Sequence, residues 1–338
     1  MPRTLAWWGG LAVTALVACA PARRNEPAPR LAPIAIVVHG GAGTIRREQM
    51  TPERAAALRR DLETAVRAGY AILASGGSSL DAVEAAVRVL EDSPLFNAGR
   101  GAVLTADGTV ELDASIMDGA AFRAGAVASV RTVKNPIHLA RLVMERTPHV
   151  LLVGDGAERF AREMGVEIVD PDYFITPERR QQWERLRARP PADDADAAAA
   201  FGTVGAVALD RQGRLAAATS TGGTMNKRPG RVGDSPIIGA GTYANRRCAV
   251  SATGAGEFFI RNAVAYDICA RMEYLGQSIE AAARAVVLEK LAAQGGDGGV
   301  IALDARGRMA MPFNTPGMYR AWAGPDGRVE VRFYRDED

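Results

Sequence analysis

The sequence has few of the residues that commonly carry catalysis or bind metals. Only three of its 338 residues are cysteine, and three are histidine. Cys19, Cys248 and Cys269 show no CxxC or Cys/His spacing, so neither a zinc site nor a redox pair is expected. Cys248 and Cys269 are expected to be buried thiols. The scattered histidines are His39, His138 and His149. No Ser/His/Asp constellation can be read from them.

Long runs of one charge are also missing. Forty-one basic residues stand against 39 acidic residues, for a formal charge of +2. Without a basic block to follow a phosphate backbone, a nucleic acid partner is not expected. The chain is 48% hydrophobic, enough for the core of one large or two modest globular domains.

The N-terminal apolar stretch is too short to span a bilayer comfortably, and it follows Arg3 and ends in small residues. This pattern is typical of an export signal over residues 1–19. The segment "LVAC" resembles a bacterial lipobox and predicts that Cys19 is lipidated and becomes the mature N-terminus. Residues 20–33 are then a disordered tether, which places the protein at the cell envelope, anchored on the periplasmic side. The alternative is an ordinary signal peptide, cleaved near Ala18 or Ala20, and a soluble periplasmic or secreted protein.

Strand and helix patterns alternate through the rest of the chain. "IAIVVHGGAG", "VELDASIMDG" and "GAVASVRTV" have the β-branched or alternating character of strands. Helical spacing predicts helices at 51–75, 79–92, 136–146, 155–164, 256–275 and 278–293, and a charged helix around 177–188. Ser78 and Asp81 offer a capping-box-like start for the helix at 79–92. "TVGAVALD" and "RLAAATST" predict a hairpin, and further short strands are expected at 299–304, 308–312 and 328–334. This is an α+β pattern: a layered sheet sandwich covered by helices, with a low-complexity linker, 170–202, between two parts of one domain.

A threonine stands where the acidic, alanine-rich run "DDADAAAAFG" meets the first strand of the predicted hairpin. If the bond between Gly202 and Thr203 breaks, the Thr203 hydroxyl lies beside its own α-amine. Such an amine has a pKa of about 7.7 to 8.0, so it can accept the hydroxyl proton near neutral pH. One residue then supplies both the nucleophile and the base, so no catalytic histidine is needed. The alternative is that Thr203 is an ordinary strand residue.

A glycine-rich loop follows the hairpin, "ATSTGGTMNKRPGRVGDSPIIGAG" at 218–241. Its Arg231 and Asp234 are a cation and an anion three residues apart, which suits a zwitterion such as a free amino-acid end. The alternative is that the two side chains pair with each other on the surface.

Several motifs together resemble the plant-type asparaginase and isoaspartyl peptidase family of N-terminal nucleophile hydrolases. They are "HGGAG" (39–43), "SPLFNAGRGAV" (93–103), "ELDASIMDG" (111–119), "GTVGAVALD", "TSTGG", "RPGRVGDSPIIGAG" and "TGAGE" (253–257). The resemblance runs from residue 34 to the C-terminus. It implies a four-layer αββα sandwich, cut by the protein itself into an α subunit (34–202) and a β subunit (203–338), and a homodimer of such units.

The resemblance also implies roles for individual residues. Thr203 is the nucleophile, freed by cleavage after Gly202, and Thr221 orients it. Thr253 and Gly254 match the oxyanion hole, and Arg231 and Asp234 bind the substrate's α-carboxylate and α-ammonium. Asn97 lies near the nucleophile and the substrate, as does Gly256, whereas His39 is expected to be structural.

No cofactor is expected for catalysis, but the loop 90–100 resembles one that wraps a structural sodium ion with backbone carbonyls. The carbonyls implied are those of Leu90, Glu91, Ser93, Phe96, Ala98 and Arg100. The expected activity is hydrolysis of β-aspartyl dipeptides and L-asparagine, small-molecule substrates that release L-aspartate. Two alternatives stay open: a glycosylasparaginase with the same chemistry, and a lipid-anchored binding protein that has lost catalysis.

Overall fold

The computed structural model describes residues 1–2, 4, 9, 32–188 and 202–337. The chain divides into two units, 1–30 and 31–338, and every helix and strand of the described residues belongs to the second. Cys19 and nearly all of the predicted tether lie outside the described residues. Among the helices that are described, none has the length and apolar character needed to cross a bilayer.

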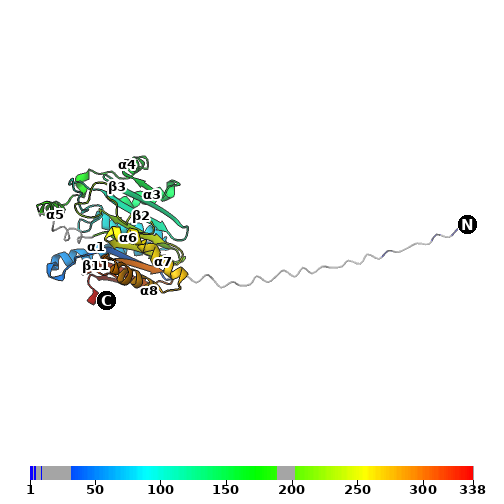
Figure 1. Ribbon diagram of the computed structural model, residues 1–338. Coiled ribbons are helices and arrows are strands. Elements are labelled where there is room, and N and C mark those ends of the chain that lie inside the picture. Colours follow the sequence, from blue (N-terminus) through cyan, green and yellow to red (C-terminus); the bar gives the residue numbers. More distant parts are fainter. Residues whose placement is uncertain (3, 5–8, 10–31, 189–201, 338) are drawn as a thin grey trace. The chain divides into compact units, whose positions relative to one another are not determined.

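Two β-sheets form the centre of the fold (Figure 1). The larger is ordered β12-β11-β1-β5-β6-β2-β3-β4 and the smaller β10-β9-β8-β7. The larger sheet contains β1 (Ala35–Gly43), β2 (Leu112–Asp118), β3 (Arg123–Val130), β4 (Leu151–Val153), β5 (Val204–Leu209), β6 (Leu215–Thr221), β11 (Gly317–Ala323) and β12 (Val329–Arg332). The smaller contains β7 (Thr242–Ala244), β8 (Cys248–Gly254), β9 (Gly298–Asp304) and β10 (Met309–Ala310).

The side chains of β1 divide between two hydrophobic cores, because alternate strand residues face opposite sides of a sheet. Ile36 and Val38 join the core built with the N-terminal helices. Ala35 and Val37 join the core shared with the smaller sheet and the C-terminal helices. The layers are therefore helices, large sheet, small sheet and helices, and the predicted α+β sandwich is confirmed.

The helices that cover the sheets follow the predicted pattern closely. The first core contains α1 (Pro52–Ala74), α2 (Ser79–Asp92), α3 (Pro136–Arg146) and α4 (Gly154–Glu163), and the second α6 (Gly256–Asn262), α7 (Val264–Tyr274), α8 (Ile279–Arg284) and the π-helix η4 (Ala285–Leu291). The predicted N-cap of α2 is present, since Ser78 accepts a hydrogen bond from the Asp81 backbone N–H. Within the predicted linker, the structure contains η2 (Pro171–Phe174) and α5 (Pro177–Arg187).

The hairpin of β5 and β6 occupies the middle of the large sheet, and every residue of both strands is buried. Asp210 holds its turn by accepting hydrogen bonds from the backbone N–H groups of Gln212 and Arg214. The register pairs Val204 with Ser220. It therefore brings the residue before β5 alongside the last residue of β6.

Several elements differ from the sequence-based expectation. Strands β4, β7, β8 and β11 were not predicted, and β11 pairs with β1 along most of its length. The predicted helix 256–275 is broken at Ala263, which has φ of +46°. The break lets α7 start on the glycine-rich loop, because the backbone N–H groups of Ala265 and Tyr266 donate to the carbonyls of Ala240 and Gly239.

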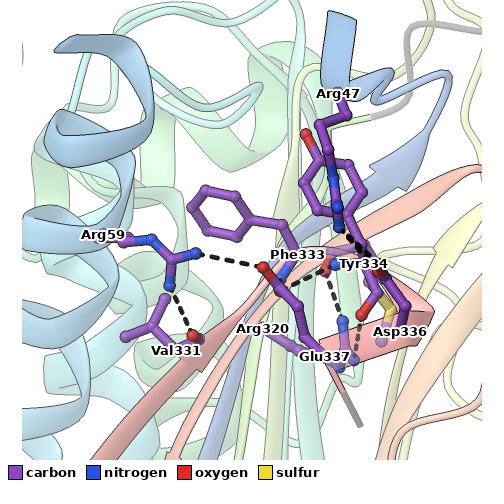
Figure 2. Close-up of polar contacts among 9 residues, drawn as sticks. Arg47, Arg59, Arg320, Val331, Phe333, Tyr334, Asp336 and Glu337 are labelled. Carbon is purple, nitrogen blue, oxygen red and sulfur yellow. Dashed lines mark hydrogen bonds and ion pairs between the residues drawn. The ribbon is translucent and has the colours of Figure 1, made fainter. Parts of the chain in front are cut away.

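Arginines fix the C-terminal segment against the N-terminal part of the chain (Figure 2). Arg47, in η1 (Arg47–Gln49), pairs with Asp336 at 2.7 Å, and Arg59 of α1 pairs with Glu337 at 3.4 Å. The fully buried Arg320 donates to the carbonyl of Tyr334. These contacts hold the end of the chain in η5 (Arg335–Glu337) beside β11 and α1.

The expectation that Cys248 and Cys269 are free buried thiols is wrong. The two residues form a disulfide with Cα atoms 5.5 Å apart. Cys248 begins β8 and Cys269 lies on α7, so the bond ties the smaller sheet to its covering helix. Their separation of 21 residues matches no motif, and only the packing of α7 onto β8 brings the sulfurs together.

Removing the disulfide is expected to lower the free energy of unfolding by about 3 kcal/mol, because the bond closes a loop of that length in the unfolded chain. The test compares protein starting at residue 20 with its Cys248→Ala/Cys269→Ala variant by denaturant unfolding, with and without reductant. Reductant should weaken the wild type toward the variant and leave the variant unchanged. A wild type as stable reduced as oxidised would contradict the prediction.

Candidate active site

Two threonine hydroxyls meet at the start of the central hairpin. Thr203 immediately precedes β5 and Thr221 ends β6, and their Oγ1 atoms are 3.0 Å apart. Both residues are buried, with exposed fractions of 8% and 2%. The Gly223 backbone N–H donates to Thr221 Oγ1 at 3.0 Å. Since that contact uses the oxygen as acceptor, the Thr221 proton is available for Thr203.

The backbone on the other side of Thr203 is tightly packed. The carbonyl of Gly202 accepts from the Asn97 N–H at 3.1 Å. A Cβ on Gly202 would lie 2.8 Å from Asn97 Cβ. Gly41 has φ of +109°, and a Cβ there would lie 2.5 Å from Gly202 Cα. Only glycine fits at either position without displacing its neighbour.

Asn97 connects the backbone of Gly202 to the loop after β6. Its side-chain amide donates to the Gly223 carbonyl at 2.7 Å, and its Oδ1 accepts from the Val103 N–H at 2.9 Å. Its own carbonyl accepts from the Gly222 N–H at 3.1 Å. One residue therefore fixes both the Gly202 carbonyl and the segment that bears on Thr221.

Thr253 and Gly254 lie at the end of β8, next to the backbone of β1 that approaches Gly202. The Thr253 hydroxyl accepts from the Ala42 N–H at 3.2 Å, and Ala42 adjoins the glycine that touches Gly202. The proton of the Thr253 hydroxyl is therefore available to another acceptor. Gly254 has no room for a side chain, since a Cβ would lie 2.4 Å from the Asp297 carbonyl oxygen.

Arg231 and Asp234 do not pair with each other, so the alternative of a surface ion pair between them is wrong. Arg231 instead forms a two-pronged contact with Glu257, at 2.9 and 3.0 Å. Asp234 is 4% exposed, and its Oδ2 has no hydrogen-bond partner in the described part of the chain. Burial raises the pKa of Asp234 to about 7, which Arg231 only partly opposes. The partner Glu257 was missed, although it stands in the quoted "TGAGE".

Gly256 shows that the two charged groups border one space. A Cβ at this position would lie 2.9 Å from Arg231 Nη2 and 3.0 Å from Asp234 Oδ1. The Arg231 guanidinium and the Asp234 carboxylate thus both approach Gly256, and only glycine fits beside them. This arrangement can hold an ion that carries both signs of charge.

Two further buried charged residues near this site, Asp113 and Lys227, were also missed. Asp113 pairs in register with Thr221, and Lys227 donates from Nζ to the Glu111 carbonyl at 2.9 Å. Burial raises the pKa of Asp113 and lowers the pKa of Lys227, and each side chain opposes the shift of the other. Lys227 also adjoins Gly223, where a Cβ would lie 3.0 Å from Nζ. Both residues fall in quoted segments, but a single sequence does not show that they lie near each other.

His39 lies between the sheets, where Nε2 contacts Ser251 Oγ at 2.9 Å. Burial lowers the pKa of His39 to about 3, and the backbone of Thr203 opposes this only in part. The ring is therefore neutral at pH 7, in agreement with the structural role predicted for it. It makes no hydrogen bond to either hydroxyl of the Thr203 pair among those the structure records.

The loop after α2 curls back on itself. The Glu91 carbonyl accepts from the Arg100 N–H at 2.7 Å. A Cβ on Gly101 would lie 2.6 Å from the Pro94 carbonyl oxygen and 2.8 Å from that of Phe96. Hard cations bind such carbonyl oxygens, so this loop is compatible with the predicted sodium ion. In the described ranges, no cluster of His, Cys, Asp and Glu suits another metal.

The Glu91 side chain is fully buried in the same loop. Its Oε1 accepts from Ser220 Oγ at 2.6 Å and from the Ile137 N–H at 3.0 Å. Burial nevertheless raises the pKa of Glu91 to about 8. The carboxyl is therefore mostly protonated at neutral pH.

Together these features define a class of α+β sandwich hydrolases, with a hydroxyl pair at the start of a central strand near the charged side chains of Arg231 and Asp234. The family model described as asparaginase matches residues 32–332, and the chain belongs to that family.

The chain aligns with its relatives over nearly their whole length. An isoaspartyl peptidase of Salmonella typhimurium is 54% identical over 310 residues, covering 89% of this chain and 98% of that protein. An isoaspartyl peptidase of Escherichia coli is 52% identical over 312 residues, covering 89% and 96%. A plant-type L-asparaginase of Pyrococcus abyssi is 47% identical over 302 residues, covering 86% and 96%. The resemblance read from the motifs is confirmed.

The raised pKa of Glu91 predicts a pH-dependent effect of Glu91→Gln. Below the unfolded-state pKa, about 4.3, both states are protonated. Between that pH and about 8, only the unfolded state loses its proton, so the wild type loses stability as pH rises. The free energy of unfolding of the variant, relative to wild type, should therefore increase from pH 5 to pH 8.

Denaturant unfolding at four pH values measures this difference, with Glu63→Gln on the surface of α1 as the control. A difference that stays constant with pH would contradict the buried, protonated state of Glu91.

Proposed function

We propose that this chain is an isoaspartyl peptidase and L-asparaginase that acts through an N-terminal threonine. The observation that carries the proposal is the contact between the Thr203 and Thr221 hydroxyls, directly after the tightly held Gly202. The nearby Arg231 and Asp234 support a substrate with a free amino-acid end. The names of the relatives support both activities.

Self-cleavage comes first. Thr203 Oγ1 attacks the Gly202 carbonyl carbon, the peptide C–N bond breaks, and an ester joins Gly202 to the Thr203 oxygen. Water then hydrolyses the ester, which leaves a carboxylate on Gly202 and a free amine on Thr203. Packing against Asn97 and Gly41 holds the bond to be cut in one position.

In turnover, the free amine of Thr203 takes the proton from its own hydroxyl. The oxygen attacks the substrate's side-chain carbonyl, and Thr253 and Gly254 stabilise the negative charge that develops on the carbonyl oxygen. The C–N bond breaks, the amine returns the proton to the leaving group, and a β-aspartyl ester remains on Thr203. Hydrolysis of that ester releases L-aspartate.

Substrate choice follows from the charged side chains of Arg231 and Asp234. Arg231, held by Glu257, binds the α-carboxylate, and the unpartnered Oδ2 of Asp234 accepts from the α-ammonium. This clamp leaves the other side of the scissile bond open to different leaving groups. The named relatives favour a peptide or ammonia over a glycosylated amine.

The proposal also includes the location of the enzyme, its oligomeric state and a bound ion. The protein is exported and anchored through a lipid on Cys19. The disulfide supports the export alone, because such bonds persist in oxidising compartments. Two units pair, and each holds a structural sodium ion in the loop after α2. The mass of the mature N-terminus, the solution mass of the protein and its bound metal content test these three points.

Intact protein is expected to give two fragments on denaturing mass spectrometry, one of them beginning at Thr203. Thr203→Ala should give one chain without activity, because both steps need the hydroxyl. The control, Thr64→Ala on the exposed surface of α1, should cleave itself like the wild type. A wild type that stays a single chain would overturn the proposal.

The raised pKa of Asp234 predicts how the product L-aspartate inhibits. Only the ionised carboxylate attracts an ammonium group, so inhibition should strengthen by about tenfold from pH 6 to pH 8. Asp234→Asn should weaken inhibition and remove that part of its pH dependence. The same pH dependence in the variant would show that another group is responsible.

A further inference from the structure

Hairpin turns at one end of the two sheets are rich in arginine. Three of these turns carry two arginines each: Arg211 and Arg214 between β5 and β6, Arg246 and Arg247 between β7 and β8, and Arg306 and Arg308 between β9 and β10. Arg211 is half-buried and the others are exposed. We call residues 210–214, 245–247 and 305–308 the arginine face.

The turns of the arginine face are neighbours in space. The Ala305 N–H donates to the Arg247 carbonyl at 3.3 Å, which joins the β9–β10 turn to the β7–β8 turn. The Gly119 N–H donates to the Leu215 carbonyl at 2.8 Å, and a Cβ on Gly119 would lie 2.5 Å from the Asn245 carbonyl oxygen. The start of the β2–β3 turn therefore lies between the β7–β8 turn and β6, and the turns form one continuous surface.

Two buried carboxylates offset two of the arginines. Asp210 pairs with Arg214 at 2.7 Å, and Asp304 pairs with Arg308 at 2.6 Å. The carboxylate of Glu280, at the start of α8, also attracts Arg308. These acids hold the turns in shape and are matched by the second arginine of each turn.

Three exposed arginines remain without such a partner. Arg246, Arg247 and Arg306 form no side-chain hydrogen bond or ion pair within the described ranges. Asp118, the acid of the neighbouring β2–β3 turn, accepts hydrogen bonds from backbone N–H groups of its own turn. The arginine face therefore has a surplus of positive charge, although the formal charge of the whole chain is only +2.

Exposed apolar side chains border these arginines. Phe122, on the β2–β3 turn, is 64% exposed, and Leu275, after α7, is 65% exposed. The Phe122 ring meets that of Tyr243, at the β7–β8 hairpin, with centroids 6.3 Å apart. Gly276, next to Leu275, lines a cavity of about 460 Å³ together with Arg247. Aromatic and aliphatic tips among arginines are typical of surfaces that lie in the headgroup region of a bilayer.

The folded unit also begins at the arginine face. The Ala32 N–H donates to the Arg211 carbonyl at 3.0 Å, and a Cβ on Gly307 would lie 3.2 Å from Pro33 Cγ. Residues 20–31 separate Cys19 from Ala32, and a chain of that length spans about 45 Å at most. The same stretch contains three arginines and a single acid, so it does not neutralise the face. A lipid on Cys19 therefore keeps the arginine face close to the bilayer.

Thr203 lies at the opposite end of the central hairpin. Strand β5 runs from Val204, next to Thr203, to Leu209, just before the β5–β6 turn. Its six residues span about 20 Å. Contact between the arginine face and a bilayer thus leaves the Thr203 end open to substrates.

We propose that the arginine face binds the surface of an anionic phospholipid bilayer. The guanidinium groups pair with lipid phosphates, and Phe122 and Leu275 enter the headgroup region. The inference rests on the location proposed above, which brings the protein to a membrane, but not on the proposed hydrolase activity. Docking in this way directs the Thr203 end away from the membrane.

The test measures vesicle binding of protein that starts at residue 20 and therefore carries no lipid. Cosedimentation compares vesicles of phosphatidylcholine with vesicles of phosphatidylcholine and phosphatidylglycerol. The wild type is expected to bind the anionic vesicles more tightly by about fiftyfold or more, because each arginine near such a surface contributes to binding. The preference should fall in high salt, since ions screen exposed charges.

The variant Arg246→Gln/Arg247→Gln/Arg306→Gln should weaken binding to the anionic vesicles by about twentyfold or more. Phe122→Ser/Leu275→Ser should weaken it by about fivefold or more, because less apolar surface is buried.

The matched control is Arg88→Gln/Arg159→Gln/Arg180→Gln, on the exposed surfaces of α2, α4 and α5. It changes the net charge equally and should bind vesicles like the wild type. Denaturant unfolding checks that all variants are folded.

The outcomes separate this inference from the proposed function. Equal wild-type binding to both kinds of vesicle would overturn it, as would wild-type binding by the variant of the arginine face. A lower solution mass of that variant, with unchanged vesicle binding, would show instead that the face is a contact between two copies of the chain. Vesicle binding without turnover of L-asparagine would overturn the proposed function and leave the arginine face standing.

Discussion

The hydrogen bond between the Thr203 and Thr221 hydroxyls is the interaction around which this structure is organised. It exists because β5 and β6 form a hairpin in the middle of the large sheet, with a register that leaves the two residues side by side at one end. Helices cover one face of that hairpin and the smaller sheet covers the other. The hydroxyls therefore have little freedom to move apart, and the proposed nucleophile, Thr203, is oriented before any substrate arrives.

Desolvation sets the chemistry of the groups around this pair. Buried away from water, Asp234 keeps an oxygen without a partner, Glu91 stays protonated and His39 stays neutral. Each state has an energetic cost in the isolated protein. At Asp234 that cost can be recovered by an incoming ammonium group, whereas Glu91 and His39 are only neutral packing elements. The same physical effect thus distinguishes a binding group from structural ones.

Much of this could be predicted from the sequence. The alternation in β5 and β6, the Ser78 cap of α2 and the order of the motifs were enough for the α+β sandwich and for the candidate residues around Thr203. What could not be predicted depends on contacts between distant segments. Strand β11 contains the buried Arg320, a charged residue that interrupts the apolar pattern of a buried strand. The break at Ala263 depends on carbonyls of another loop. The disulfide is set by packing alone, whereas α5 inside the linker was predicted, at 177–188.

The strand order of the large sheet has a consequence for a chain cut after Gly202. Strand β1 comes from the first fragment and lies between β11 and β5 of the second, while β6 of the second adjoins β2 of the first. Strands of the two pieces alternate within the large sheet, and neither piece forms the complete sheet by itself. Because both cysteines of the disulfide follow the cut, that bond does not join the pieces. Separating them would mean breaking three strand pairings at once, so the two pieces stay together for as long as the protein is folded.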